Sequence, residues 1–364
     1  MSTMSGRMSK DEMVTQYQYL RLRKILLLIV CIAGIILFAG LFSVSVVDEL
    51  SLWDVYKVIW NHITGAEEYE PRSRLWWADI FIWDTAMPHI VVGILAGAGL
   101  AVCGTLMQSV MVNPLADPYS TGISSGACFG AVLSIIVGFS LATFGEDSSI
   151  VVNAFLGALI PVILIIVVAE KIDMTPATLI LIGTCVSYFF TSMVTFFMIS
   201  TDADTLSAAY MWQVGDIDDI GWSEIPIMLV VVVIGSVLSI FLARKLNVMS
   251  LGDKSAIALG LDVRKFRILC LVLMAFITAS IVAFTGILGF VGLVAPHIVR
   301  LVIGSDNRFV MPISMAVGAL LILLADNITM HLSSIPVGVV LSAIGSPIFL
   351  ILILKQRKGG GVLY

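Results

Sequence analysis

The chain has 364 residues, of which 59% are hydrophobic and only 12% are charged, and its formal net charge is −5 at pH 7. A soluble domain carries about 25% charged residues, so this composition excludes an ordinary soluble protein. A membrane-spanning helix needs about 20 mostly apolar residues, and such runs recur along nearly the whole chain. The composition therefore predicts an all-α, polytopic membrane protein.

Ten apolar runs are long enough, or nearly long enough, to be spans. They lie at about 24–47, 88–112, 121–141, 150–169, 177–199, 225–243, 266–285, 287–303, 309–328 and 335–354. The first run is too long for a signal-peptide core and lacks a clear cleavage site, so we expect a retained span. The organisation expected is a polar segment over 1–23, one transmembrane domain over 24–355 and a tail over 356–364.

Charge predicts the orientation of these spans. If the N-terminus is cytoplasmic and the spans alternate, 17 of the 20 Lys and Arg residues fall inside, and only Lys57, Arg72 and Arg74 fall outside. This asymmetry follows the positive-inside rule. The same topology places 16 acidic residues outside, which makes the outer face about −13, from 3 basic against 16 acidic residues. The charge pattern thus predicts that both termini lie in the cytoplasm.

Sequence motifs for catalysis and metal binding are missing. The five cysteines are scattered in apolar segments and are read as packing residues. Four histidines form no His-Glu-x-x-His motif, and there is no Gly-x-Ser-x-Gly elbow. Gly252 to Ser255 read GDKS, but a phosphate-binding loop needs glycine directly before the lysine and a second glycine five residues earlier. We therefore expect no catalytic residue, no metal and no cofactor bound by this chain.

The stretch QSVMVNPLADPYSTGISSGA, residues 108–127, interrupts two glycine-rich apolar runs. Pro114 and Pro118 offer no amide hydrogen, so a continuous helix cannot pass through it. Backbone groups that have lost their helical hydrogen-bond partners are tolerated at membrane depth only when they are buried in protein or line a water-filled cavity. We expect Asn113 to satisfy the end of one helix and Asp117 to cap the start of the next. An ordinary cytoplasmic turn would explain Asp117 alone, but small-residue helices on both sides favour a break beside an aqueous path.

Two other polar residues interrupt apolar runs. Asp326 lies within LLILLADNITM, and an intramembrane carboxylate is a functional candidate by default. A helix-end or interhelical hydrogen bond near the outer interface is the interpretation we favour for it. His297, beside Pro296 and Arg300, is expected to donate between helices rather than to bind a ligand.

Four stretches resemble the FecCD-type permeases of ABC importers, which carry iron–siderophore complexes, haem or vitamin B12. The stretches are GAGLAVCGTLMQSVMVNPLADPYSTGISSGA (97–127), MWQVGDIDDIGW (211–222), LGDKSAIALGLDVRKFR (251–267) and the C-terminal region from GFVGLVAPHIVRLV to IPVGVVLSAIGSPIFLILI. The resemblance covers about residues 86 to 355.

This resemblance implies a BtuC-like fold and a homodimer with the substrate path on its two-fold axis. It also implies two cytoplasmic ATPase subunits that carry ATP and Mg²⁺, and an extracytoplasmic binding protein. Asn113 and Leu115 match positions that close the cytoplasmic end of the path. Together with Pro114, Asp117 and Pro118 they form the predicted gate segment. The expected coupling loop lies within 244–265, and its matching residues are Leu251, Gly252, Asp253, Ala256, Leu259 and Gly260.

The chain departs from the family at its outer end. The usual Arg-Leu-Pro-Arg pattern is replaced by Ala86, Met87, Pro88 and His89, and the arginine expected after Asp326 is Met330. Because fixed positive charges are lost on an acidic face, we expect a binding protein that presents basic residues. The candidate docking residues are Glu67, Glu68, Asp216, Asp218 and Asp219, with Arg72 and Arg74 as alternative replacements for the missing arginines.

The function expected from this sequence is ATP-driven import of an iron chelate, with a ferric siderophore preferred over haem or cobalamin. An ion-coupled secondary transporter that uses Asp117 or Asp326 as a proton site is the alternative, since broken helices also suit that class. A receptor or scaffold without transport is disfavoured, because a passive anchor gains nothing from glycine-lined, proline-broken segments.

Overall fold

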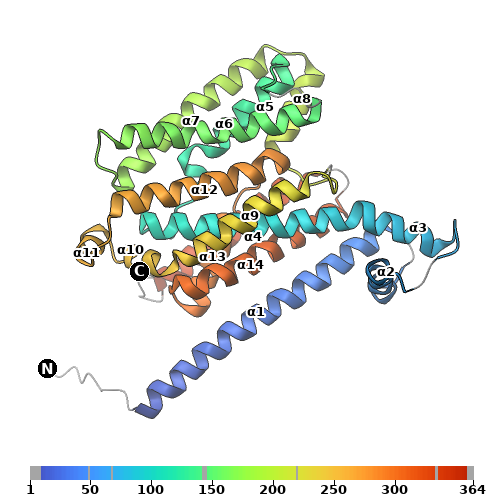
Figure 1. The fold of residues 1–364 in the computed structure, drawn as a ribbon, viewed down its shortest axis with the longest axis horizontal. Helices are drawn as coiled ribbons and strands as arrows, with labels where there is room; N and C mark the ends of the chain where they lie inside the picture. The colour runs from blue at the N-terminus through green and yellow to red at the C-terminus, as the bar shows by residue number, and fades with distance from the viewer. Residues whose placement is uncertain are drawn as a thin grey trace.

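The computed structural model describes residues 10–47, 50–66, 69–141, 146–218, 220–332 and 335–358, and all regular secondary structure in them is helical (Figure 1). The elements are α1 (Lys10–Val46), α2 (Leu52–Thr64), α3 (Arg74–Phe81), the π-helical turn η1 (Ile82–Ala86), α4 (Met87–Met111), the 3₁₀ turn η2 (Pro118–Thr121), α5 (Ile123–Val137), α6 (Glu146–Ala169), α7 (Pro176–Ile199), α8 (Ala203–Val214), α9 (Ile225–Phe241), α10 (Ala243–Met249), α11 (Asp253–Ala258), α12 (Val263–Thr285), α13 (Val291–Ile303), α14 (Asn307–Thr329) and α15 (Val337–Lys358).

The predicted spans correspond to observed helices. Among the described residues, six helices are long and apolar enough to cross a membrane, and the count is seven if α9 and α10, which are bent by 58° at their junction, are taken as one span. Three shorter apolar helices, α5, α13 and α15, supply the rest. Two of these, α5 and α13, correspond to the predicted runs at 121–141 and 287–303. The prediction of an all-α membrane fold with about ten spans is confirmed.

Helix α4 forms the centre of the bundle, and almost all of its side chains are buried. It lies between α9 and α12 on one side and α13 and α14 on the other (Figure 1). Glycines allow these contacts: a Cβ added to Gly104 would lie 1.6 Å from the carbonyl oxygen of Gly292 on α13. A Cβ on Gly97 would lie 2.3 Å from the Gly318 carbonyl oxygen on α14. Backbone-to-backbone packing of this kind is typical of membrane helices.

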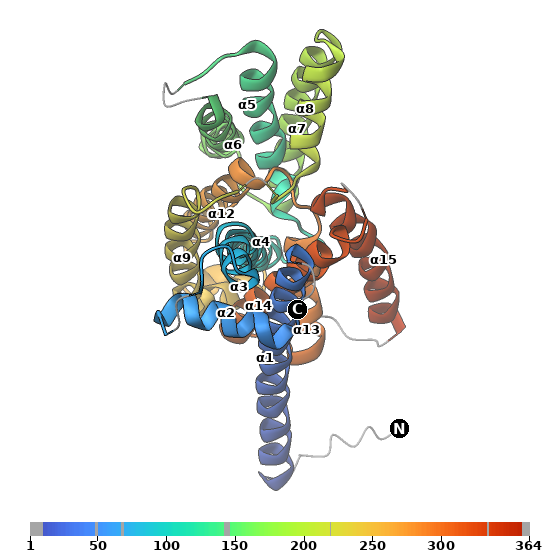
Figure 2. The ribbon, with the colours of Figure 1, turned by 90° about the vertical axis from the view of Figure 1, so that its right-hand side faces the viewer.

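Helices α5 to α8 form a separate layer that packs on α12 (Figure 2). Its closest pair is α5 with α6, where a Cβ on Gly126 would meet the Gly157 carbonyl oxygen at 2.4 Å. A Cβ on Gly130 would meet the Asn153 carbonyl oxygen at 2.0 Å. The close helix approach that the sequence predicted from small residues four apart is therefore confirmed on both sides of the interrupted segment.

The two ends of the bundle differ in composition. One end, here named the acidic end, holds α2, α3 and the connection from α8 to α9, and the other, the basic end, holds α10 and α11 (Figure 1). At the acidic end the indole side chains of Trp53, Trp60 and Trp77 are exposed, as in the aromatic belts of membrane interfaces. Helix α2 lies across the end of α1 (Figure 2) and begins with a capping box between Ser51 and Asp54.

The second span begins earlier than the sequence predicted. Residues 74–111 form one helical rod in which the π-helical turn η1 directly precedes Pro88. A proline ring clashes with the carbonyl group four residues before it, and a wider turn relieves that clash. The helical span therefore begins at Arg74, whereas the sequence predicted that it begins at Pro88.

Candidate functional site

The gate segment connects α4 to α5 at the basic end. Helix α4 ends at Val112, which adopts a left-handed conformation with φ of 49°. The Asn113 amide donates to the Gln108 carbonyl oxygen at 3.1 Å, and the Leu115 amide donates to the Asn113 side chain at 2.9 Å. Asn113 thus satisfies the helix end as predicted, and the Leu115 side chain is left 49% exposed.

Asp117 caps the turn that follows. Its Oδ1 accepts a hydrogen bond from the Tyr119 amide at 2.8 Å, and Pro118 occupies the first position of η2. Gly122, with φ of 88°, then turns the chain into α5. The predicted break, with a cap at Asp117, is confirmed. Burial raises the pKa of the Asp117 carboxyl to about 6, and the Tyr119 amide hydrogen bond opposes this rise.

The predicted coupling loop folds into the short helix α11 between two glycines. Gly252 has φ of 90° and Gly260 has φ of 84°, a region that favours glycine. Ala256 packs inward and is fully buried. The outer side carries three exposed apolar side chains, Leu251, Ile257 and Leu259, at 62%, 62% and 64% exposure. Apolar groups exposed together in this way mark an interaction surface.

Arg267 on α12 connects this loop to the gate segment. Its guanidinium binds the Asp253 carboxylate of α11 in a two-pronged pair, with Nη2 to Oδ1 at 2.7 Å and Nη1 to Oδ2 at 3.3 Å. Nη2 also donates to the Val110 carbonyl oxygen, in the last turn of α4, at 3.3 Å. Nη1 donates to the Met174 carbonyl oxygen in the connection from α6 to α7. A single side chain, 1% exposed, therefore joins α12 to α11, to the end of α4 and to the connection from α6 to α7.

The sequence pattern did not predict this role for Arg267. Helical spacing carried the signal, because Val263, Cys270 and Met274 lie on the buried face of α12 together with Arg267. An arginine on a buried face needs partners there, since an unpaired buried charge is costly.

A second polar cluster lies where α4, α13 and α14 meet. Arg300 Nη2 donates to Ser109 Oγ at 3.0 Å and to Asn307 Oδ1 at 2.9 Å. His297, one turn before Arg300, does not donate between helices as expected. Among the described residues neither of its buried ring nitrogens has a hydrogen-bond partner, and its ring packs edge-on against Phe349. That interpretation of His297 was wrong, because the side chain that its ring meets on α15 is aromatic.

A cavity of about 730 Å³ lies between the end of α8, the α12–α13 connection and α15. Its wall includes Gln213, Gly289, Ser342 and Ser346. The other lining residues are glycine, alanine, valine, isoleucine and proline, and this mostly apolar, uncharged surface suits a bulky guest. Figure 2 shows α8 and α15 on the same side of the bundle, away from α1 and α9.

The docking residues predicted at the acidic end are only partly described. Arg72 precedes α3, Arg74 begins it, and both are exposed. Asp216 and Asp218 lie in the connection after α8 and line a second cavity of about 330 Å³ with Met211, Thr285 and Gly286 among its other walls. Glu67, Glu68 and Asp219 lie outside the described residues.

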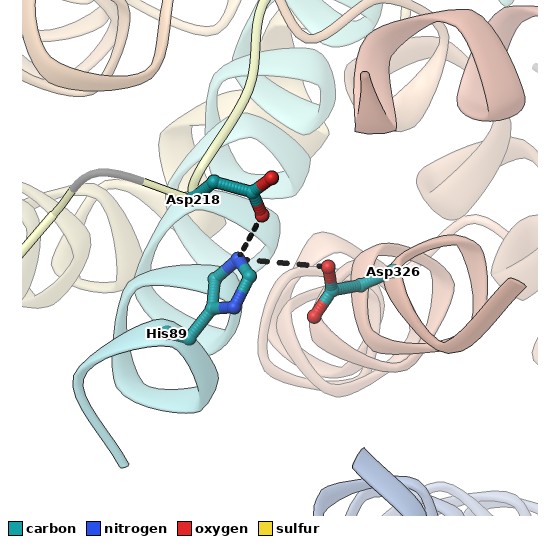
Figure 3. Close-up of side chains that lie close together, drawn as sticks. All are labelled: His89, Asp218 and Asp326. Carbon is teal, nitrogen blue, oxygen red and sulfur yellow. Dashed lines mark ion pairs between the residues drawn. The ribbon is translucent and has the colours of Figure 1, made fainter. Parts of the chain in front are cut away.

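Asp326 has a different environment from the one expected. Its side chain is fully buried, and neither carboxylate oxygen has a hydrogen-bond partner in the described part of the chain. The hydrogen bond expected there was therefore wrong, and the adjacent Asn327 makes the interhelical bond, to the Phe38 carbonyl oxygen at 2.9 Å. Figure 3 shows Asp326 directed at His89 of α4 and Asp218. His89 Nε2 lies 3.3 Å from Asp218 Oδ1 and 3.6 Å from Asp326 Oδ1.

Comparison with known proteins adds the family context. Residues 32–355 match the sequence model of the FecCD transport family. The chain is 36% identical over 283 residues to the cobalamin import system permease protein BtuC of Halobacterium salinarum, covering 77% of this chain and 75% of that protein. It is 33% identical over 307 residues to the hemin transport system permease protein HmuU of Yersinia pestis, covering 83% and 89%. A solved inward-facing structure, assigned to the metal-chelate type of ABC transporter, superposes with a TM-score of 0.77 at 28% identity, covering 90% of this chain and 98% of that chain.

Proposed function

Because this chain belongs to the FecCD transport family, we propose that it is the membrane-spanning permease subunit of an ATP-driven importer for an iron chelate. Its proposed location is the bacterial cytoplasmic membrane, with the basic end in the cytoplasm. It carries no ATP-binding motif of the phosphate-loop type, so hydrolysis is assigned to partner subunits.

The bridge made by Arg267 is the observation that carries this proposal. It contacts Asp253 on α11 and the Val110 carbonyl group three residues before Asn113. A displacement of α11 is therefore transmitted through a buried, two-pronged ion pair to the end of α4, where the gate segment begins. Pairs of this geometry are strong and directional, which suits a mechanical link.

The ATPase subunits are assigned to the exposed side of α11. Leu251, Ile257 and Leu259 would fill a cleft on such a subunit, and the surrounding basic residues would orient it. An anionic lipid surface would also attract the basic residues, but it does not explain three apolar side chains presented around one short helix.

The substrate path is assigned to the 730 Å³ cavity between α8 and α15. In a homodimer, two such cavities would face each other across the two-fold axis. Their combined size, and mostly apolar walls that carry a few uncharged polar groups, suit a bulky chelate more than a bare ion. Relatives named for cobalamin and for hemin, and a structural neighbour of metal-chelate type, support this class of cargo. Ferric siderophore, haem and cobalamin remain the three cargoes to test.

The binding protein is assigned to the acidic end, where it would present basic residues. Exposed carboxylates there include Glu70, Asp202 and Asp204. Their replacement by lysine is expected to weaken binding-protein affinity at low salt and to remove its salt dependence. Unchanged affinity at low salt would refute the reversed docking polarity.

An ion-coupled transporter is the second candidate, and the buried carboxylate of Asp326 and the raised pKa of Asp117 favour it. Asp117→Asn separates the two functions, since asparagine is also a good helix cap but carries no titratable group. An ATP-driven permease should keep most of its transport in this variant. A carrier that uses Asp117 for protons should lose it.

The deciding experiment is reconstitution of this chain in proteoliposomes with its ATPase subunits and binding protein. Binding protein loaded with ferric siderophore, haem or cobalamin is added outside, and uptake is followed with ATP inside or with a proton gradient alone. Uptake that needs ATP and continues without the gradient supports the importer. Uptake driven by the gradient without ATPase subunits would assign the chain to the second candidate.

A further inference from the structure

From the cluster of His89, Asp218 and Asp326 at the acidic end we propose a binding site for a divalent transition-metal ion of the Zn²⁺ class. The three residues come from α4, the connection after α8, and α14 (Figure 3). One ligand atom from each lies within 4.8 Å of the other two. This inference goes beyond the proposed transport function, because it concerns a resident ion and not the cargo.

The distances fit coordination better than hydrogen bonding. Charge-assisted N–H···O bonds measure about 2.7–2.9 Å. His89 Nε2 lies 3.3 Å from Asp218 Oδ1 and 3.6 Å from Asp326 Oδ1, and Nε2 makes no hydrogen bond among the described residues. In a tetrahedral zinc site with bonds of about 2.0–2.1 Å, neighbouring ligand atoms are roughly 3.3 Å apart. The Asp218 side chain, which would supply the third ligand, is 65% exposed.

The exposed pair His62–Asp79 provides an internal contrast. The same two residue types meet there at 2.8 Å between Nδ1 and Oδ1, which is an ordinary hydrogen-bond distance. No third metal-ligating residue lies near that pair among the described residues, whereas the buried cluster has three potential ligand atoms within 4.8 Å of one another.

Burial supplies the second argument. Asp326 is fully buried, and both of its oxygens lack a hydrogen-bond partner within the described chain. The His89 side chain is 7% exposed. A buried carboxylate needs a compensating partner, and a divalent cation balances the charge of two carboxylates. A proton on Asp326 is the competing way to remove the charge, and the experiment separates the two.

Access and selectivity follow from the surroundings. Asp218 also lines the 330 Å³ cavity, together with Asp216, so the site adjoins a space whose negative charge attracts cations. Imidazole nitrogen with two carboxylate oxygens suits Zn²⁺, whereas Mg²⁺ and Ca²⁺ prefer oxygen ligands alone. Three protein ligands leave a fourth position for water from this cavity. A bound ion would tie the connection after α8 to α4 and α14.

The test measures metal on the full-length permease in nanodiscs, after removal of any affinity tag, in a Cys185→Ser background because Cys185 is an exposed cysteine. The protein is equilibrated with Zn²⁺, Mn²⁺ or Mg²⁺, and bound metal is counted by mass spectrometry. Zn²⁺ is expected at about one ion per chain and Mg²⁺ at background. Asp218→Asn and Asp326→Asn are each expected to weaken Zn²⁺ affinity by about 10-fold to 100-fold or more, while His62→Gln leaves it unchanged.

Thermal unfolding provides the second readout. Zn²⁺ should raise the unfolding temperature of the parent protein and of His62→Gln, but not of Asp218→Asn. If Asp326→Asn does not fold, Asp218→Asn still decides, because its side chain is exposed. Zn²⁺ stoichiometry near zero, or equal in parent and Asp218→Asn, would overturn the proposal. The Asp326→Asn variant also separates the two explanations. If it is as stable as the zinc-free parent and binds no less Zn²⁺ than the parent, then Asp326 carries a proton and is not a metal ligand.

Discussion

Arg267 and Asp253 form a two-pronged ion pair, with Nη2 and Oδ1 2.7 Å apart, that fastens α11 to α12. Because the same guanidinium binds the carbonyl groups of Val110 and Met174, the pair connects the proposed ATPase-docking surface to the gate segment. The proposed coupling between ATP hydrolysis and the gate segment depends on this connection.

Removal of the acidic partner should uncouple the transporter. Asp253→Ala loses hydrogen bonds to a charged group that contribute about 1.5–3 kcal/mol, so the docked orientation of α11 should become about 10-fold to 100-fold less populated. We expect transport by the reconstituted complex to fall by at least about tenfold, with ATP hydrolysis reduced less.

The matched control is Lys254→Ala, which changes an exposed neighbour on α11 without touching Arg267. It should transport at close to the parent rate. Equal transport by Asp253→Ala and Lys254→Ala would show that the ion pair does not transmit motion.

The apolar side of α11 should hold the ATPase subunit. Ile257→Ser together with Leu259→Ser removes two side chains that are 62% and 64% exposed in the isolated chain. Burial of an apolar side chain contributes about 1.5–3 kcal/mol, so affinity for the ATPase subunit should fall by at least about tenfold. Co-purification and titration by light scattering measure the loss.

Leu22→Ser, an exposed apolar position near the start of α1, is the control and should bind normally. Retained affinity in the double variant would place the ATPase elsewhere.

Packing of α4 on α13 leaves no room for a methyl group at Gly104. A Cβ there would lie 1.6 Å from the Gly292 carbonyl oxygen, so the two helices must separate. Gly104→Ala should lower the free energy of unfolding by about 3 kcal/mol or more, and should reduce the yield of folded protein. Gly93→Ala, on the same helix, meets side-chain atoms of Leu323, Ile322 and Ile217, from 3.2 Å, and should lose far less stability. Similar stability of the two variants would contradict the close approach of α4 and α13.

Acid should weaken the start of α14. Hydrogen bonds from the Arg308 guanidinium, with a smaller contribution from Asn247, lower the pKa of the Asp306 carboxyl from 3.8 to about 2. A lowered pKa gives stability that is fully present above pH 3.8 and is lost as the pH falls through about 2. Asp306→Asn should therefore lower the free energy of unfolding by up to about 2 kcal/mol near neutral pH. The difference in this free energy between variant and parent should vanish near pH 2.

Unfolding in detergent across this pH range measures the difference. Asp173→Asn, which alters an exposed residue in the connection from α6 to α7, is the control and should change stability little at any pH. A constant difference between Asp306→Asn and the parent from neutral pH to pH 2 would rule out the carboxylate as its source.

Much of the fold followed from the sequence because hydrophobic runs and proline positions act locally. Ten apolar runs predicted ten helical segments, and the two prolines of the gate segment predicted its break. The start of the second span was wrong, since a π-helical turn before Pro88 keeps residues 74–111 in one rod. Local patterns alone do not show how a helix accommodates a proline in its interior.

The sites were harder to predict because they join distant parts of the chain. Arg267 and Asp253 are 14 residues apart, but the carbonyl groups that complete the bridge lie 93 and 157 residues away. His89 and Asp326 meet only because α4 packs against α14, and neither residue belongs to a recognisable metal motif. The expectation that this chain binds no metal rested on motifs alone, and the proposed site is incompatible with it.

The most direct test of the central claim is the thiol-labelling rate of a cysteine at Leu115, in a Cys185→Ser background, within the complete complex in nanodiscs. Leu115 is 49% exposed in the gate segment, so its accessibility should report whether that segment is open or closed. We predict that ATP binding to the partner subunits changes the labelling rate several-fold, and that Asp253→Ala abolishes this change. A labelling rate that is the same with and without ATP, in a complex that transports its cargo, would contradict the account.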